Sequence, residues 1–341
     1  MVAPDSCTGS YENEATTPRQ QEKQMSDNQT RRGGSLFSKL FCTDFDPSAA
    51  ASYYTEEPTL DDTVPKLLED VAQTRSKKRR KAALQQLYEL TDKDHIANRV
   101  PMVCGNTPCN VLDSLASDLS RKDRRMTCLM LNNLSVPVEN KSVMVNWENG
   151  RLIGALQEVI RKAQPESYLC LLCLQNLSAA EECRAPLLTY VPGAGDRNSV
   201  RNMTSLLRTI ELLLQSFARY TFVEGRKSVE GEAVRYALGF LRNTTNITKD
   251  EHNAELVLAT DIPRILLRLL RDSPKPLARW ARDSVEDSAL IILVNVAHCT
   301  GAAQKMSAVG AEPILLALEQ RGTGIHSVRA STIRCWLEEH K

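Results

Sequence analysis

Hydrophobic residues recur along most of this chain at the spacing of an α-helix. One short pattern appears five times, with a small residue at its first position, a leucine at its fifth and, in four copies, an asparagine at its seventh. The apolar positions within the pattern lie on one face of a helix. The sequence therefore predicts five amphipathic helices, at residues 83–90, 127–134, 170–177, 237–244 and 289–296.

A second marker follows the seventh position of each copy after 15 to 18 residues: Gly105, Gly150, Gly193, Asp261 and Gly310. Glycine suits a left-handed helix end, and a proline soon after the marker, as in three of the copies, suits the first turn of the next helix. Apolar stretches of helical spacing then follow, at residues 111–119, 152–160, 206–217, 265–270 and 314–318. Each repeating unit is thus predicted to contain a short helix, a glycine turn, a middle helix, a loop and a final helix.

With these two markers at a constant offset, the chain resembles the armadillo repeat family. The units of that family have a glycine turn, a leucine-rich second helix and a third helix ending in leucine-x-asparagine-leucine. The resemblance covers residues 65–341, as five units and a last helix at residues 327–339. It implies an all-α fold, a right-handed α–α superhelix (armadillo-type solenoid) of about five three-helix repeats. The two-helix HEAT repeat is the nearest structural alternative, and the glycine turn argues against it. The unit that ends at Asn243 is longer than the others, so loops are expected around its middle helix.

The resemblance also implies a binding surface. In armadillo proteins the third helices line a concave groove, and their asparagines hydrogen-bond the backbone of an extended partner segment. An amide can do this for any sequence because it offers both a donor and an acceptor. The alternative is that such an asparagine bonds the backbone of a neighbouring repeat, since buried polar groups need partners either way. Aligned by the repeat, the candidate groove residues are Asn133, Asn176, Asn243 and Asn295, and the first unit has Glu89 instead.

The sequence departs from one well-known group of armadillo proteins. Importin-alpha-like receptors carry a tryptophan four residues before each asparagine, where it builds pockets for lysine side chains. The corresponding positions of this chain are Leu129, Leu172, Gly239 and Ile291. This difference argues against a classical nuclear-import receptor.

Residues 1–64 differ in composition from the rest of the chain. They are rich in Ser, Thr, Gln, Asn and Glu, and carry a net charge of −6 against +7 for the remainder. Such a segment cannot bury enough apolar surface to offset its ordering entropy, so it is predicted to be a disordered acidic tail. A short Leu/Phe motif at residues 35–42 places Leu36, Phe37, Leu40 and Phe41 on one helix face. This motif is expected either to dock into a partner's groove or to pack on the first turn of the folded region.

The near-zero net charge of +1 hides an uneven distribution. Two basic clusters lie one repeat apart, and stacking should place them side by side as a basic ridge, whereas residues 283–287 of a later unit are acidic. The ridge is expected to dock an acidic segment, either of a partner or of the tail itself; the alternative is a set of solvated loop ends. Residues 77–81 also fit a nuclear localisation signal. The ridge residues are Lys77, Lys78, Arg79, Arg80, Lys81, Arg121, Lys122, Arg124 and Arg125.

Several function classes find no support in the sequence. Bulk positive charge of the kind that binds nucleic acid is absent, and no stretch reaches 18 uninterrupted apolar residues, so membrane insertion is not expected. No secretory signal is recognisable, so the cysteines are expected to be reduced thiols. Cys170 and Cys173, like Cys128 and Cys299, occupy positions of a helix core with no histidine at ligand spacing, which favours core thiols over a metal site. No catalytic cluster, cofactor motif or small-molecule site is evident. The Asn-x-Ser/Thr triplets at Asn133 and Asn176 fall inside repeat helices, so they are not expected to be glycosylated.

These observations favour a non-enzymatic scaffold or adaptor of the cytoplasm, the nucleus or both, which binds an extended or helical, acidic segment of a protein partner. The alternative is an armadillo-like cofactor of Hsp70 that speeds nucleotide release. No motif in the sequence favours this alternative. The sequence leaves the partner open, because solenoids bind through surfaces that the fold alone does not specify.

Overall fold

The computed structural model describes residues 63–73, 76–105, 111–192, 204–219, 229–246, 251–272, 279–321 and 324–340. All of them belong to one compact unit, residues 58–341. Within these ranges the regular secondary structure is entirely helical. Residues 1–62 of the predicted tail, with its Leu/Phe motif, lie outside the described residues, as does Gly193. Residues 63 and 64 belong to the helix Thr63–Gln73, where Val64 is completely buried, so the folded region begins by residue 63 and not at residue 65.

The helices form successive layers. Each full layer has three helices, and a two-helix layer comes before the first full one. The first helices are α6 (Arg99–Cys104), α9 (Val138–Asn146), α12 (Glu181–Thr189), α15 (Glu251–Leu258) and α18 (Ala302–Ala308). The second helices are α4 (Thr63–Gln73), α7 (Val111–Leu119), α10 (Arg151–Arg161), α13 (Leu206–Arg219), α16 (Ile262–Asp272) and α19 (Ala311–Arg321). The third helices are α5 (Lys77–Glu89), α8 (Arg125–Leu134), α11 (Ser167–Leu177), α14 (Val229–Thr244), α17 (Arg279–Ala297) and α20 (Ile325–Glu339). Two 3₁₀ turns, η1 (Lys93–Asn98) and η2 (Trp147–Gly150), join neighbouring helices.

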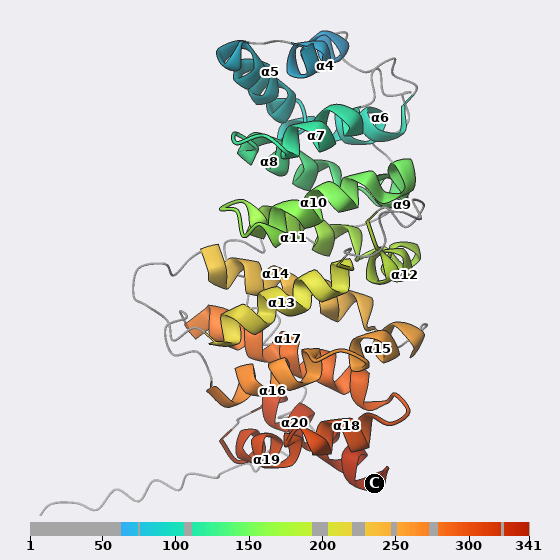
Figure 1. Cartoon of the computed structure of the whole chain (residues 1–341), viewed down its shortest axis with the longest axis vertical. Helices are drawn as coiled ribbons and strands as arrows, with labels where there is room; N and C mark the ends of the chain where they lie inside the picture. Colours follow the sequence, from blue (N-terminus) through green and yellow to red (C-terminus); the bar gives the residue numbers. More distant parts are fainter. Residues whose placement is uncertain are drawn as a thin grey trace, which may run out of the picture. The chain divides into compact units, whose positions relative to one another are not determined.

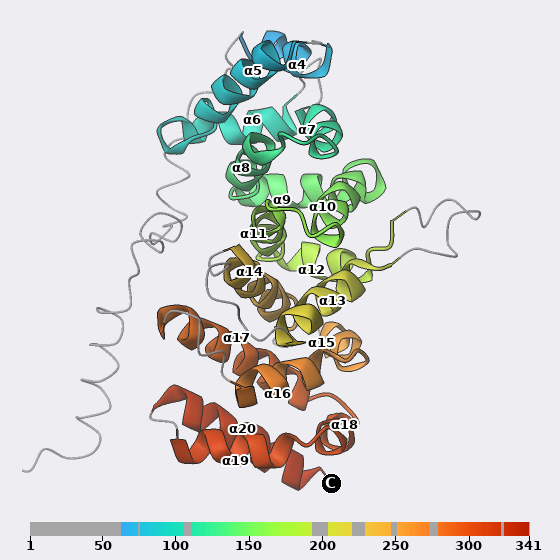
Figure 2. The same cartoon turned by 60° about the vertical axis from the view of Figure 1, so that its left-hand side comes forward.

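Consecutive layers stack in the order of the chain, as Figures 1 and 2 show. Each third helix contacts the third helix of the next layer, from α5 to α20, and the second helices contact one another in the same way from α4 to α19. The five predicted third helices and the five predicted middle helices are all present. The predicted last helix is α20, which completes the fifth three-helix layer.

The repeated sequence pattern explains this stacking. The leucine at the fifth position of each copy is completely buried, and the small residue at the first position is buried as well, which lets neighbouring helices approach closely. Each layer therefore buries the same apolar positions against the layers on either side of it, and together they form one continuous core. The five leucines are Leu87, Leu131, Leu174, Leu241 and Leu293.

The glycine turns follow the prediction at two positions and depart from it at a third. Gly150 before α10 and Gly310 before α19 have φ of 83° and 77°, the left-handed conformation that favours glycine. Gly105 ends α6 with φ −74° and ψ 155°, which is ordinary extended backbone, so its predicted left-handed turn is wrong. Its lack of a side chain still matters, because a Cβ there would lie 2.3 Å from the Pro101 carbonyl oxygen.

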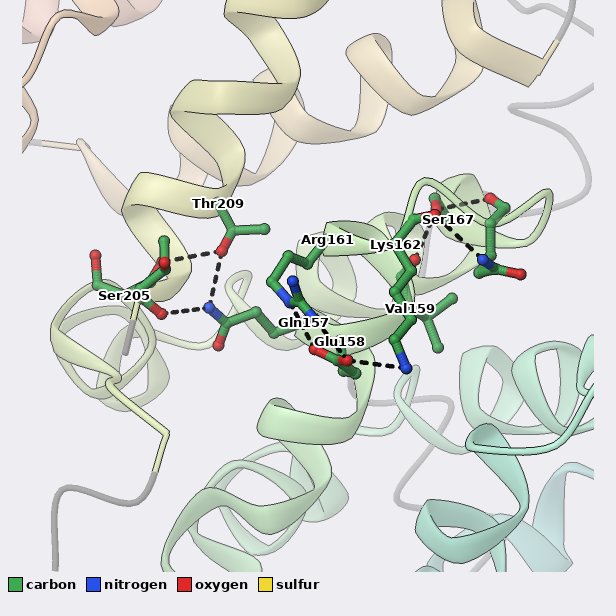
Figure 3. Close-up of polar contacts among 10 residues, drawn as sticks. Gln157, Glu158, Val159, Arg161, Lys162, Ser167, Ser205 and Thr209 are labelled. Carbon is green, nitrogen blue, oxygen red and sulfur yellow. Dashed lines mark hydrogen bonds and ion pairs between the residues drawn. The ribbon is translucent and has the colours of Figure 1, made fainter. Parts of the chain in front are cut away.

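Polar contacts also join second helices of adjacent layers, as Figure 3 shows for α10 and α13. The buried Gln157 amide donates to the Thr204 carbonyl oxygen (2.6 Å) and to Thr209 Oγ1 (2.8 Å). On the exposed side of the same helix, Glu158 accepts hydrogen bonds from Arg161 and forms an ion pair with Lys162. The Gln157 contacts join the two layers on the second-helix side, whereas the Glu158 contacts stabilise α10 itself.

Candidate functional site

The four candidate asparagines form a regular row along the third helices. Each side chain donates a hydrogen bond from Nδ2 to a hydroxyl at the end of the preceding third helix. The pairs are Asn133 to Thr91 (3.3 Å), Asn176 to Ser135 (3.1 Å), Asn243 to Ser178 (3.2 Å) and Asn295 to Thr245 (3.3 Å). We call this row the asparagine ladder.

Each hydroxyl of the asparagine ladder can only accept a hydrogen bond from its asparagine. Each hydroxyl donates its own proton to a carbonyl oxygen of its own helix, at distances of 2.8 to 2.9 Å. The hydroxyl oxygen must therefore accept from the asparagine, which fixes the orientation of the amide. Asn243 also donates to the backbone carbonyl oxygen of Gln175 (3.1 Å), so the bond to a neighbouring repeat's backbone that the sequence left open occurs at one position.

The other half of each ladder amide remains available. The four side chains are only half-buried, and among the described residues no donor contacts their Oδ1 atoms. Each carbonyl oxygen can thus accept a hydrogen bond from outside the chain without breaking the contacts between layers. The ladder therefore presents a row of half-buried acceptor oxygens along the third helices.

The positions four residues before the asparagines line the same helix face. Leu129, Leu172 and Ile291 are half-buried there and provide apolar surface beside each amide. Gly239 interrupts the row, because a Cβ at this position would lie 2.5 Å from the side-chain amide of Gln175, which covers it. The face thus carries a row of amides and, one helical turn away on each helix, a row of apolar side chains that Gly239 interrupts.

Comparison with solved structures addresses the fold. A designed armadillo repeat protein matches over 80% of this chain and 99% of its own, with a TM-score of 0.58 and 15% identity. An engineered protein solved by a structural genomics consortium matches over 82% and 98%, with a TM-score of 0.56 and 15% identity. The chain has an armadillo-type fold. The predicted all-α solenoid is thereby confirmed, whereas no protein-family model and no curated protein matches the sequence.

The armadillo stack brings the two basic clusters together, since α5 and α8 pack side by side. Two members of the predicted ridge are not on the surface. Arg80 is buried in an ion pair with the buried Asp118, which also accepts a hydrogen bond from Thr127 Oγ1 at 2.5 Å. Arg124 is buried too, and its Nε donates to the backbone carbonyl oxygen of Arg121 (2.7 Å). These two arginines stabilise the stack and are not part of an exposed surface.

Acidic neighbours neutralise part of the remaining ridge. Lys77 pairs with Asp123 (2.9 Å) and holds the pKa of that carboxyl below its usual range, mainly through their hydrogen bond. Arg79 pairs with Asp70 (2.6 Å), and Arg121 lies 3.7 Å from Asp118. Arg125 donates to the Tyr168 hydroxyl (3.1 Å). Three exposed lysines form no ion pair within 4 Å among the described residues and are the most open part of the ridge, although Lys81 also contributes to the lowered pKa of Asp123: Lys78, Lys81 and Lys122.

The acidic stretch at the other end of the stack is engaged with α20. Asp287 forms an ion pair with Arg329, and His326 Nε2 lies 3.6 Å from the same carboxylate. His326 Nδ1 lies 3.9 Å from Glu286. The stretch therefore joins the last two layers in addition to carrying negative charge.

The core cysteines show no sign of reactivity. Cys128 and Cys170 are buried with their sulfur atoms 3.8 Å apart, and Cys173 is buried beside them. Burial raises the pKa of the Cys173 thiol to about 12, so it is protonated at neutral pH. Across the described ranges no three acidic, histidine or cysteine side chains are placed to hold a metal ion. None of the helices in these ranges is both long and apolar enough to span a membrane.

Sequence reasoning missed the hydroxyl half of the ladder. The acceptors Ser135, Ser178 and Thr245 each lie two residues after a ladder asparagine. They belong to Asn-x-Ser/Thr triplets, so the signal was present in the sequence. The role of the triplets follows only from the stacking of the layers, because the hydrogen bond joins the asparagine of one layer to the hydroxyl of the layer before.

Proposed function

We propose that this protein is a non-enzymatic scaffold or adaptor that binds an extended segment of a protein partner along its asparagine ladder. One observation carries the proposal: the ladder amides use their Nδ2 atoms to join the layers and keep their carbonyl oxygens available. A backbone N–H of a bound segment would donate to each oxygen, and apolar side chains of the segment would contact Leu129, Leu172 and Ile291.

The charge near the ladder favours an acidic segment. Lys81 and Arg125 lie eight residues before the ladder positions of their helices, Lys78 lies three residues further back on α5, and Lys122 lies in the loop before α8. Carboxylates of a segment that crosses α5 and α8 would meet this basic flank. Such surface charges contribute more to the association rate and to specificity than to affinity.

A selection experiment tests the proposal with the full chain. Peptides chosen from a random library by binding to the protein should be enriched in Asp and Glu. Their affinity, measured by fluorescence polarisation, should fall by about tenfold or more in the Asn176→Ala/Asn243→Ala double variant, because two hydrogen bonds of about 1 kcal/mol each are lost. The matched control is Asn146→Ala, which removes an exposed asparagine that bonds only within α9.

Helical content and thermal midpoint of both variants should be compared by circular dichroism, so that loss of binding is separated from loss of structure. Selected peptides that bind the double variant as tightly as the wild type would show that the ladder is not the binding surface.

We also propose that the protein acts in the cytoplasm, the nucleus or both. The seven cysteines in the described ranges are free thiols, in keeping with a reducing compartment. No feature of the described residues favours the Hsp70 cofactor role over the adaptor role.

A further inference from the structure

The last layer carries a surface pocket of about 550 Å³ that lies between α19 and α20. Seven of its eight lining residues come from one face of α20, and the eighth comes from α19. Two of the eight are acidic and none is basic. The lining consists of Glu319, Ser327, Val328, Ser331, Thr332, Cys335, Trp336 and Glu339.

The pocket lies at the end of the asparagine ladder. The buried residues of α17 and α20 align in the same register, with Ala289 matching Ala330 and Ile292 matching Ile333, both pairs being completely buried. In this register Trp336 takes the position that Asn295 has in the layer before. The contact confirms the placement, because His298, one turn after Asn295, meets the Trp336 ring edge to face at 4.2 Å.

The indole is fixed in position by its neighbours. His340 stacks on it with ring centroids 4.5 Å apart and an interplanar angle of 12°. Together with His298, this contact holds Trp336 as a rigid apolar wall of the pocket. Such a wall suits the aliphatic part of a long side chain.

Two hydroxyl oxygens of the pocket act as acceptors. The Ser327 hydroxyl donates its proton to the Glu319 carbonyl oxygen (3.0 Å), and the Thr332 hydroxyl donates to the Val328 carbonyl oxygen (2.9 Å). With their protons committed, these oxygens offer lone pairs only. The lining still offers the indole N–H of Trp336 and the thiol of Cys335 as donors, but it has no basic side chain to balance the charge of an anion.

The two carboxylates differ in their state. Glu319 is paired with Arg334, whose Nε lies 3.0 Å from Oε2, and this hydrogen bond holds the pKa of Glu319 below its usual range. Glu339 is exposed and has no cationic partner among the described residues. Glu339 is therefore the charge that a ligand would neutralise. The described residues include no metal-binding group of three, which points to an organic cation.

We propose that this pocket receives an arginine or lysine side chain of the segment bound along the asparagine ladder. The methylene groups would contact Trp336, and the cationic head would donate to Glu339 and to the hydroxyl oxygens. This inference rests on the proposed function and deepens it by naming the chemistry of one end of the segment. The segment would place acidic residues toward the lysines of α5 and α8 and a basic residue toward α20, which sets its direction.

The test uses the full chain and a probe that reaches only the pocket. N-acetyl-arginine methylamide has no charge other than its side chain, and N-acetyl-citrulline methylamide is its neutral isostere. The protein has three tryptophans, and labelling them with fluorotryptophan gives separate ¹⁹F resonances, of which that of Trp336 is assigned with Trp336→Phe. The arginine derivative should shift the Trp336 resonance saturably, and the citrulline derivative should not.

Charge-matched variants sharpen the test. Glu339→Gln should weaken binding of the arginine derivative by about fivefold, the magnitude of one exposed ion pair. Glu139→Gln, which removes an exposed carboxylate of the distant α9, should leave binding unchanged. An unmoved Trp336 resonance, or equal shifts with arginine and citrulline, would overturn the proposal. Neither result would change the outcome of the peptide-binding experiment with the ladder variants, so the two proposals can fail separately.

Discussion

Asp118 gives the most direct test of how the first layers are held together. Its carboxylate is 1% exposed and pairs with the guanidinium of Arg80, which is 7% exposed, while Thr127 Oγ1 donates to its other oxygen at 2.5 Å. The three residues come from α7, α5 and α8, so this single carboxylate joins two layers. Replacing Asp118 with alanine leaves the Thr127 hydroxyl without its acceptor and leaves the buried guanidinium with only the more distant carboxylate of Asp123, at 3.9 Å.

The expected cost is large because the remaining charge stays buried. Breaking a buried ion pair on one side typically costs about 3 to 5 kcal/mol, so Asp118→Ala should lower the free energy of unfolding by about 4 kcal/mol. Arg80→Ala should cost a similar amount. The double variant should cost clearly less than the sum of the two, since neither charge is then left alone.

Urea unfolding followed by circular dichroism measures these differences, provided that the transition stays cooperative. Lys78→Ala, a change at an exposed ridge lysine of the same helix as Arg80, is the control and should shift stability by at most about 0.5 kcal/mol. If Asp118→Ala were no more destabilising than Lys78→Ala, the buried ion pair would not exist as described and Arg80 would belong to the exposed ridge after all.

Two further predictions concern the turns and the pH dependence of the stack. Gly150→Ala should lower the free energy of unfolding by about 2 to 4 kcal/mol, because φ is positive and a Cβ would lie 2.4 Å from Tyr190 Cε2. Gly310→Ala, with positive φ but no atom within 4 Å, should cost only about 1 kcal/mol; equal urea midpoints for the two variants would contradict the Tyr190 contact. For Glu158, a hydrogen bond from Arg161 holds the pKa at about 2, below the ordinary 4.5. A lowered pKa stabilises the fold above pH 4.5, and this contribution is lost as pH falls toward 2. The difference in urea midpoint between the wild type and Glu158→Gln should therefore shrink over that range, and a constant difference would refute the ion-pair assignment.

The repeated third-helix pattern was enough to predict the layers, because the same positions are buried in every copy. Leu131 and Leu174, for example, occupy the fifth position of their copies and are completely buried. The glycine turns were predictable only in part. Gly150 has the left-handed backbone that the pattern suggests, but Gly105 is required for close approach to Pro101 and not for its backbone angles.

The site was less accessible to sequence reasoning, because its chemistry depends on contacts between layers. Nothing local distinguishes Arg80 from Lys81, yet the first is buried against Asp118 and the second is exposed. The ladder position of Trp336 was also missed, although its helix repeats the buried register of α17. α20 has no asparagine at the ladder position, so its alignment with α17 follows only from which of its residues are buried.

The central claim is that the ladder carbonyl oxygens accept backbone hydrogen bonds from a bound segment. Backbone N-methylation of a selected peptide, one residue at a time, removes those donors directly. In the wild type, methylation at the residues facing Asn176 and Asn243 should weaken binding by about tenfold each, the value of one well-placed hydrogen bond at the upper end of its range. In Asn176→Ala/Asn243→Ala the same methylations should have little further effect, because donor and acceptor form one coupled pair. Losses that are equal in the two proteins would contradict the claim.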